Sequence, residues 1–537
     1  MTNSPHVPQP ATRRPRFVAG LLLSIVALAL AVRLYRLDAQ PLWIDEEASL
    51  EDALAFGRAG LAGLATDHVA PLHTVLLWVV SRIGGMSESA LRLPSVLAGV
   101  LCVPMTFAVV RRLFGDTQVA LASALLVAVS PFAIWYAQEA RMYALLMLFA
   151  LVHVHLSWPV VTRELRAAEL GALTIVTTLG LYTHHYMLLL SGTFGLFLLL
   201  AGGASGIAAT LHSRRFWTWS ATQLLALALF GFWLWMTADK LGNDAGFSKP
   251  AAILWAPYAL FTFVTGPAFG PSTAELRGSV GAALRAEIGP IALVATTAAI
   301  VSLAGLRAVL RPDRRLAGSW LLTWLLLPLT LAILATLLTR IQFNVRYVIF
   351  SFPALMILFA LALHDALAAP RRRWPVLLAG AVTLGLMTVS LGNWFSDPRY
   401  GKEDLRCAAV ILGPATRAGI LVVADNQRAI PILNYYGAPI SRATPAVDNI
   451  ATGRTPAVVT AMLDRSVRQG AIPHVWFVSY RTWESDPDHR VQQWLDAHCR
   501  VTRAVRLTGV MLRRYAGCAP ASGAISVSPP PPTVSGR

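Results

Sequence analysis

Long apolar runs separated by short polar joints occupy most of the first 390 or so residues. A window of about 19 residues finds roughly eleven runs long enough to cross a membrane as helices. The pattern therefore predicts a mainly α polytopic membrane helix bundle. The predicted spans are Phe17–Val32, Leu91–Val110, Val119–Trp135, Tyr143–Val160, Leu170–His184, Met187–Gly203, Trp217–Met236, Ile288–Val309, Trp320–Leu338, Tyr347–Leu367 and Val376–Leu391.

Two further apolar stretches, Pro71–Ile83 and Ala251–Phe263, are too short to cross a membrane. We expect both to lie along the membrane surface as interfacial helices, with their aromatic residues near the lipid headgroups. There they could cover a cavity formed by the spans.

After Leu391 the chain becomes more polar, and helix-like segments alternate with the strand-like segments GILVVAD and PHVWFVSY. This alternation predicts a small α/β domain. A final segment rich in Pro and Ser is typical of disorder. The predicted organisation is a tail over residues 1–16, a membrane domain over 17–392, an α/β domain over 393–518 and a disordered tail over 519–537.

Arginines gather at alternate joints, so the positive-inside rule places these joints in the cytoplasm. The same alternation puts the N-terminus in the cytoplasm and the α/β domain outside, and the first span is expected to act as a signal anchor. The formal net charge of +17 is mostly topological, and the dispersed arginines do not predict nucleic-acid binding. The joints contain Arg13, Arg14, Arg16, Arg111, Arg112, Arg163, Arg166, Arg214, Arg215, Arg311, Arg314, Arg315, Arg371, Arg372 and Arg373.

Three of the four cysteines lie in the predicted outer domain, where an oxidising compartment permits disulfides. Cys499 and Cys518 flank two strand-like segments joined at Thr508-Gly509, a hairpin that would bring them opposite each other. A disulfide between them is therefore predicted, and two separate buried thiols are the alternative.

Acidic residues mark two of the outer loops, as Asp45 and Glu46 in LWIDEEASL and as Glu139 in WYAQEARMY. Taken singly, the first pair could be a solvated loop, and Glu139 could form an ion pair with Arg141. Brought together, these carboxylates could deprotonate and orient a hydroxyl acceptor.

Cationic and imidazole groups complete the candidate chemistry of the outer face. Arg346 begins a span at its outer end, where it could bind a lipid-linked phosphate or extend to the headgroups. His184 and His185 are adjacent on a predicted helix and point about 100° apart, which favours hydrogen bonding over a shared metal. A divalent metal ion held by Asp45, Glu139 and His68 is a second interpretation.

An ordered set of motifs, WIDEE, APLH, LRLPSVLAG, SPFAIWYAQEARMYALL, LYTHHY and RYVIFSFPAL, resembles the bacterial glycosyltransferase family 39. This group belongs to the GT-C superfamily and is related to protein O-mannosyltransferases and lipid A aminoarabinose transferases. The resemblance implies inverting transfer from a polyprenyl-phosphate-linked sugar donor to a hydroxyl acceptor at the outer face of the bacterial plasma membrane. It also implies that Asp45 is catalytic, with Glu46 and Glu139 as accompanying acids, and that Arg346 contacts the carrier phosphate.

The chain departs from the family at Val69–His73, where His-Pro-Pro-Leu-Tyr is usual, and at Glu47, where a small residue is common. A changed substrate pocket is therefore expected, and the acceptor, whether glycan, lipid or protein, stays open. A transporter or flippase of lipid-linked sugars, also in contact with membrane lipids, is the alternative function. The predicted substrate-binding residues are Arg346, Tyr347, Arg141, His184, His73 and Gln138.

Overall fold

A computed structural model describes residues 15–64, 71–201, 203–237, 254–338, 343–440, 456–468 and 473–518. The chain forms two compact units, each described here by itself. The membrane unit contains Met1–Ala39 and Ala48–Tyr400, and the C-terminal unit contains Gln40–Glu47 and Gly401–Arg537. The acidic segment that precedes residue 48 is thus grouped with the C-terminal residues.

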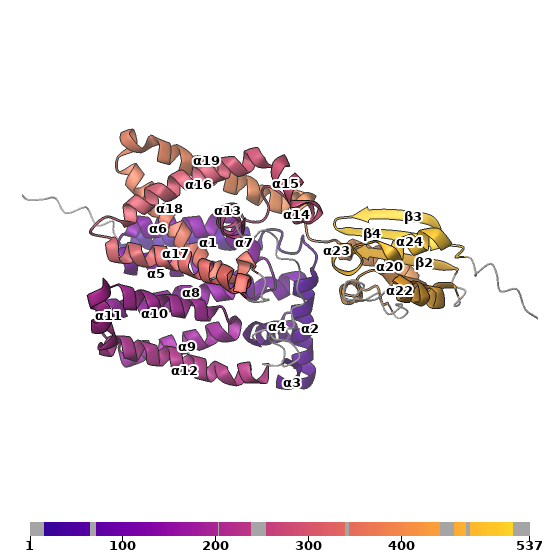
Figure 1. The fold of residues 1–537 in the computed structure, drawn as a ribbon, viewed down its shortest axis with the longest axis horizontal. Coiled ribbons are helices and arrows are strands. Elements are labelled where there is room, and N and C mark those ends of the chain that lie inside the picture. The colour runs from indigo at the N-terminus through magenta and orange to yellow at the C-terminus, as the bar shows by residue number, and fades with distance from the viewer. Residues whose placement is uncertain are drawn as a thin grey trace, which may run out of the picture. The chain divides into compact units, whose positions relative to one another are not determined.

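In the described part of the chain, eight helical segments are long and apolar enough to span a membrane (Figure 1). They are α1 (Pro15–Leu34), α5 (Glu88–Phe114), α8 (Tyr143–Ser157) with the 3-10 turn η1 (Trp158–Val161), α12 (Arg214–Met236), α16 (Ile288–Val309), α17 (Arg315–Leu338), η4 (Val345–Ser351) with α18 (Phe352–Leu367), and α19 (Pro370–Ser396).

Helices α6 (Thr117–Val129) and α7 (Pro131–Ala137) form one further apolar segment, bent by 57°. The two remaining predicted spans correspond to the shorter apolar helices α9 (Ala167–Thr183) and α10 (Met187–Leu200). The prediction of a polytopic helix bundle is confirmed, and the count of eleven stays a prediction.

Shorter helices connect the long ones. The predicted interfacial segments form α4 and α13, and part of the second segment lies outside the described residues. The connecting helices are α2 (Ile44–Ala59), α3 (Leu61–Leu64), α4 (Pro71–Ile83), α11 (Gly203–Leu211), α13 (Trp255–Thr265), α14 (Thr273–Gly278), α15 (Val280–Ala286) and η5 (Pro398–Tyr400).

The bend between α6 and α7 follows from Pro131, which has no N–H to offer the carbonyl of Val127 one turn earlier. Arg33, fully buried at the end of α1, supplies the missing donors. Its guanidinium donates to the carbonyl oxygens of Val127 and Ala128 at 3.2 and 2.9 Å. An arginine thus caps the broken end of α6 inside the bundle.

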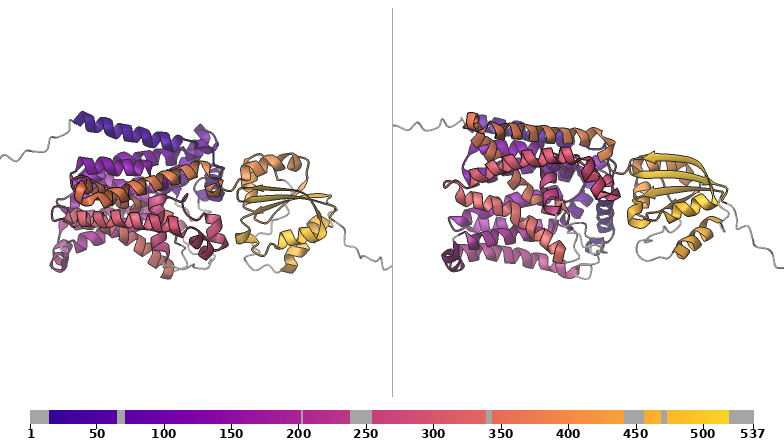
Figure 2. Two further views of the ribbon diagram at one scale, coloured as in Figure 1. Left: turned by 90° about the horizontal axis from the view of Figure 1, so that it is seen from above. Right: turned by 45° about the horizontal axis from the view of Figure 1, so that its top comes forward.

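Helix α18 lies in the middle of the packing, and every residue from Phe352 to Ala362 is buried. A helix that is apolar on all sides needs such surroundings. In Figures 1 and 2 the long helices of the membrane unit run side by side, with α18 among them.

The arginine-rich joints meet at one end of this bundle. Arg112 donates to the carbonyl of His155 at 2.6 Å, and Arg215 donates to the carbonyl of Val161 at 3.1 Å. The carboxylate of Asp365, at the end of α18, lies within 4.0 Å of the guanidinium groups of Arg311, Arg314 and Arg373. The arginine-rich joints that predict the topology therefore lie at one end of the folded bundle.

The C-terminal unit is built on a four-stranded sheet in the order β1-β2-β4-β3, in which β1 and β2 are parallel and the other neighbours antiparallel. This confirms the predicted small α/β region. Its elements are α20 (Leu405–Arg417), β1 (Leu421–Ala424), α21 (Ala429–Tyr435), α22 (Pro456–Leu463), the π-helical turn η7 (Asp464–Arg468), β2 (His474–Tyr480), α23 (Thr482–Ser485), α24 (Arg490–His498), β3 (Arg500–Leu507) and β4 (Val510–Ala516).

Successive residues of β1 face opposite sides of this sheet, as the pleat requires. Val422 and Ala424 pack in the cluster formed with α20 and α21, whereas Leu421 and Val423 pack with α22 and α24. Helices therefore cover both faces of the sheet.

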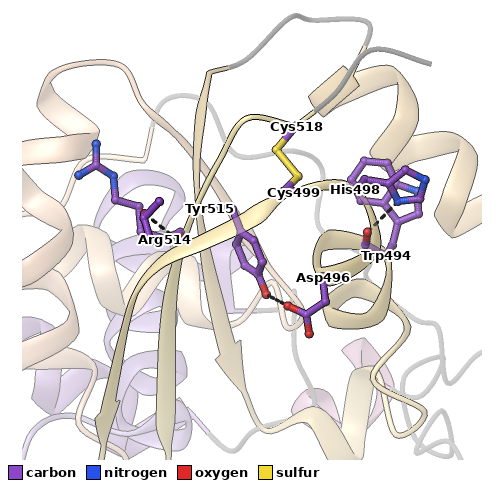
Figure 3. Close-up of a disulfide and its surroundings, with 8 residues drawn as sticks. Trp494, Asp496, His498, Cys499, Arg514, Tyr515 and Cys518 are labelled. Carbon is purple, nitrogen blue, oxygen red and sulfur yellow. Dashed lines mark hydrogen bonds between the residues drawn. A yellow bond between two sulfur atoms is a disulfide. The ribbon is translucent and has the colours of Figure 1, made fainter. Parts of the chain in front are cut away.

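The hairpin of β3 and β4 turns at Thr508-Gly509, where Gly509 has a φ of 64° that suits glycine. Cys499 and Cys518 are joined at the open end of the hairpin by a disulfide, with their Cα atoms 4.1 Å apart (Figure 3). This is the pairing that the hairpin predicted. The Tyr515 hydroxyl donates to Asp496 at 2.6 Å beside it and ties β4 to α24.

Candidate active site

The turn between α7 and α8 carries two of the predicted site residues. Glu139 is almost fully buried there, and one of its carboxylate oxygens accepts a hydrogen bond from Trp135 Nε1 at 3.0 Å. Arg141 donates from Nη1 to the hydroxyl of Ser49 at 2.6 Å, and its carbonyl oxygen accepts from the Ser95 hydroxyl. The turn is therefore anchored to α2 and α5.

Two arginines lie over the same aromatic ring, that of Tyr143 at the start of α8. The guanidinium carbon of Arg346 is 5.2 Å from the ring centroid, and that of Arg141 is 5.8 Å from it. Arg346 also lies 5.7 Å from the ring centroid of Tyr347. Two sequence-distant cations thus share one aromatic support, where cation–π attraction favours them.

Aromatic and imidazole rings from the turn between α9 and α10 extend this cluster. The ring centroid of Tyr347 lies 5.4 Å from that of His184 and 5.3 Å from that of Tyr186. The structure therefore brings Arg141, His184, Arg346 and Tyr347 together in the membrane unit, and their role in substrate binding stays a prediction.

The two adjacent histidines differ from the expected arrangement. Helix α9 ends at Thr183 and His184 is extended, so the two side chains do not diverge by 100° on one helix. Instead the rings of His184 and His185 stack, with centroids 4.7 Å apart. His184 Nδ1 accepts a hydrogen bond from the backbone N–H of Tyr186, in line with the predicted hydrogen-bonding role.

His73, on α4 outside the membrane-spanning helices, is buried. Burial, followed by the nearby charge of Arg141, lowers the pKa of His73 from 6.5 to about 3. Its imidazole is therefore neutral at physiological pH. A neutral imidazole can donate or accept a hydrogen bond without adding charge beside the arginines.

Gln138, predicted to bind substrate, is held by the protein on both sides of its amide. Its Nε2 donates to the carbonyls of Arg33 and Tyr35 at 3.0 and 2.9 Å, and its Oε1 accepts from Trp394 Nε1 at 2.7 Å. These three hydrogen bonds hold the amide of Gln138 within the fold, and its role in substrate binding stays a prediction.

The acidic residues at the start of α2 belong to the C-terminal unit. Glu46 is fully buried, and its carboxylate accepts a hydrogen bond from Lys402 Nζ at 2.9 Å. Asp45 is half-buried and, as the neighbouring residue of the same helical turn, points about 100° away from Glu46. The two predicted catalytic acids therefore differ in environment, and only Glu46 is fixed in this ion pair.

Among the described residues, no three His, Cys, Asp or Glu side chains lie close enough to hold a metal ion. His68, one of the ligands of the metal interpretation, lies outside these residues. The residues that the structure gathers, two arginines and several rings, suit an anionic ligand better than a cation.

Lys402 and Arg33 were missed by sequence reasoning. The rarity of lysine was one available signal for Lys402, because this arginine-rich chain has lysine at only three positions, Lys240, Lys249 and Lys402. Arg33 sits at the end of an apolar run, where an interfacial arginine is the ordinary interpretation.

Comparisons with known proteins concern the fold and one segment of the chain. Residues 68–235 match the family model of the dolichyl-phosphate-mannose-protein mannosyltransferases. No curated protein matches the chain significantly.

Solved structures extend the likeness to nearly the whole chain. ArnT from Cupriavidus metallidurans in the apo state aligns over 93% of this chain and 98% of its own, with 14% identity and a TM-score of 0.54. The same protein bound to undecaprenyl phosphate aligns over 92% and 98%, with 15% identity and a TM-score of 0.53. The oligosaccharyltransferase AglB from Archaeoglobus fulgidus, in complex with an inhibitory peptide and a dolichol-phosphate, aligns over 93% and 74%, with 12% identity and a TM-score of 0.51.

The matched segment and the shared architecture confirm the predicted resemblance. This chain is a multi-pass membrane protein with the GT-C fold, similar in fold to ArnT over nearly its whole length and similar to the protein O-mannosyltransferase family over residues 68–235.

Proposed function

We propose that this chain is a membrane glycosyltransferase that moves a sugar from a polyprenyl-phosphate-linked donor to a hydroxyl acceptor at the outer face of the bacterial plasma membrane. The class of donor is supported by the solved relatives, one bound to undecaprenyl phosphate and another to a dolichol-phosphate. The acceptor is a hydroxyl group on a glycan, lipid or protein.

The observation that carries the proposal is the pair of guanidinium groups over Tyr143. Stacking on a ring uses the flat face of a guanidinium, whereas its N–H groups lie in the plane and match the oxygens of a phosphate. Arg346 would bind the carrier phosphate and stabilise the negative charge that develops as the sugar leaves. Arg141, in the turn between α7 and α8, would help to stabilise the same negative charge.

In the proposed reaction, Asp45 takes the proton from the acceptor hydroxyl while that oxygen forms a bond to the anomeric carbon of the sugar. The bond between this carbon and the phosphate oxygen breaks, and its electron pair stays on the phosphate. Polyprenyl phosphate leaves, and the configuration of the sugar is inverted by a single displacement. Glu139 would orient the acceptor, and no covalent enzyme intermediate is formed.

The test is sugar transfer by purified protein in liposomes, supplied with a panel of radiolabelled polyprenyl-phosphate sugars and acceptor fractions from the cell envelope. Asp45→Asn is expected to lower kcat by about 10²-fold or more, as the loss of a general base does. Arg346→Ala is expected to lower kcat/KM for the donor by roughly 10²- to 10³-fold, the effect of removing a charge-stabilising group. Arg346→Lys should recover only part of this loss, because an ammonium cannot form a bidentate contact.

Glu51→Gln is the matched control, since Glu51 is an exposed acid on the same helix as Asp45. It should transfer sugar like the wild type. Full activity of a well-folded Asp45→Asn protein would refute the proposed base. Movement of lipid-linked sugar across the bilayer without transfer, unchanged in all variants, would instead support the transporter alternative.

A further inference from the structure

The segment Gln40–Glu47 and the residues that follow Tyr400 form one compact unit although some 350 residues separate them. We propose that Lys402 is a positioning residue, through which the C-terminal unit holds the acidic turn that carries Asp45 in its working orientation. This inference rests on the proposed function, because it assigns a task to Lys402 in that reaction.

Lys402 contacts the acidic segment at three places. Its ammonium group donates to Glu46 at 2.9 Å and lies 5.7 Å from the ring centroid of Trp43. Its backbone N–H donates to the side-chain oxygen of Gln40 at 2.9 Å. Both side chains of the ion pair are nearly or fully buried, so water screens their attraction little.

Further contacts hold the same segment from α20 and α21. The Tyr436 hydroxyl accepts a hydrogen bond from the backbone N–H of Leu42 at 2.7 Å. Arg406 donates to the carbonyl oxygen of Gln40 at 3.1 Å and lies over the Tyr436 ring. The backbone before Asp45 is therefore fixed at Gln40 and Leu42, and the side chain after it is fixed at Glu46.

Lys402 is itself held by the sheet. The next residue, Glu403, accepts a hydrogen bond at 3.2 Å from Arg481, which follows β2 directly. The backbone N–H of Asp404 donates to the carbonyl of Thr508 in the β3–β4 turn at 2.8 Å. A side chain at Gly509 would collide with Glu403, which shows how closely the turn packs there. These contacts connect the sheet to Lys402 and Lys402 to Glu46.

This geometry gives Glu46 and Asp45 different tasks in the proposal. Glu46 is turned toward Lys402, and Asp45, about 100° further round the first turn of α2, is not turned the same way. Removing Lys402 would take away the ion-pair partner of a buried carboxylate, which destabilises the turn that holds Glu46. Asp45 would then lose its alignment although its own chemistry is intact.

The experiment compares Lys402→Met, Lys402→Arg, Glu46→Gln and the double variant Glu46→Gln/Lys402→Met, with Arg503→Met on the exposed strand β3 as the control. Lys402→Met is expected to lower kcat at least tenfold while the donor KM stays within about twofold, because the phosphate site belongs to other residues. Lys402→Arg should restore most of kcat. The double variant should be no less active than Lys402→Met alone, since no buried charge is left over.

Hydrogen exchange, followed by mass spectrometry on the full chain, provides a readout that does not need activity. Peptides covering residues 40–47 should exchange faster in Lys402→Met and as in the wild type in Arg503→Met. Unchanged exchange and unchanged kcat in Lys402→Met would overturn the proposal. Losses of kcat that multiply in the double variant would also overturn it, because they would mean that the two residues act independently. If the wild type transfers no sugar but Lys402→Met still exchanges faster, the structural contact is supported and the proposed function is rejected.

Discussion

Asp425 is fully buried directly after β1, where the parallel strands β1 and β2 end. One of its oxygens accepts a hydrogen bond from the backbone N–H of Tyr480 at 2.8 Å. Burial raises the pKa of the Asp425 carboxyl from 3.8 to about 8, and the nearby Asp486 adds to this. The group is therefore expected to be protonated in the folded protein at neutral pH.

The stability of the C-terminal unit should consequently fall as the pH rises. Between about pH 4 and pH 8 the folded state binds a proton that the unfolded state has lost, so the free energy of unfolding decreases across this window and levels off above it. Asp425→Asn should remove this decrease, because the amide oxygen can still accept from Tyr480. Hydrogen-exchange protection of the β1 and β2 peptides, compared between variant and wild type at pH 6 and pH 9, measures the effect.

Asp488→Asn serves as the control for this measurement, because Asp488 is an exposed carboxylate of the same unit. Its pH dependence should match that of the wild type. Equal pH dependence in wild type and Asp425→Asn would contradict a protonated Asp425.

At the residue scale, the motifs predicted Arg141, His184, Arg346 and Tyr347 as site residues, and these lie together, but the motifs did not predict the hydrogen-bond partners of Gln138 and Glu46. A carboxylate in a motif looks the same whether it faces a substrate or a lysine. What decides between them is a partner 356 residues away, and no local pattern encodes it. The stacking of His184 and His185 was missed because it depends on where α9 ends, and helix ends are the least certain part of a prediction.

At the scale of elements, the approach of α5 to the α6–α7 break depends on Gly99. A Cβ atom there would lie 2.7 Å from Cβ of Ala137 and 3.1 Å from Nε of Arg33, the residue that caps α6. Gly99→Ala should therefore displace Arg33 or separate the helices and destabilise the protein by roughly 1–3 kcal/mol. The measurement is the midpoint temperature of unfolding in detergent.

Gly192→Ala is the matched control, because a Cβ atom at Gly192 meets nothing within 4 Å. Alanine forms helices better than glycine, so this variant should unfold at the same or a slightly higher temperature. An unchanged midpoint for Gly99→Ala would show that the helices at the break can separate without loss.

The β3–β4 hairpin is the element that sequence predicted most fully, from its turn to its cross-link. Reduction of the Cys499–Cys518 disulfide, which closes a chain separation of 19 residues, should destabilise the C-terminal unit by about 3 kcal/mol. Mass mapping of the unreduced, denatured protein should show Cys102 and Cys407 alkylated and the other two linked. Alkylation of all four cysteines without reduction would refute the disulfide.

For the whole molecule, hydropathy predicted the bundle because a lipid environment requires long apolar helices, and strand alternation predicted the C-terminal sheet. The grouping of Gln40–Glu47 with the C-terminal unit could not be predicted. It arises from buried polar contacts between segments some 350 residues apart, and a single sequence contains no periodic signal for such contacts.

Orientation in the membrane is a testable property of the whole chain. Cys407 is exposed on α20, and a hydrogen bond to Asp404 raises the pKa of its thiol, so its labelling should be slower than that of an ordinary exposed cysteine. A membrane-impermeant maleimide should label Cys407 in intact spheroplasts. In a Cys407→Ser background, a cysteine introduced by Arg372→Cys should react only after the membrane is permeabilised. Labelling of Cys407 only after permeabilisation, together with labelling of the introduced cysteine in intact spheroplasts, would show that the topology is the reverse of the predicted one.

The separation of Glu46 from Lys402 along the chain also has a consequence for biosynthesis. Translation proceeds from the N-terminus, so the acidic turn leaves the ribosome long before its lysine partner, and every membrane helix after α1 is made in between. A nascent chain that stops at Tyr400 contains the membrane helices but lacks the contacts that Lys402, Arg406 and Tyr436 make with residues 40–46. The segment made directly after the first membrane helix is thus among the last to reach its final structure, and a prematurely terminated chain would lack the lysine partner of its acidic turn.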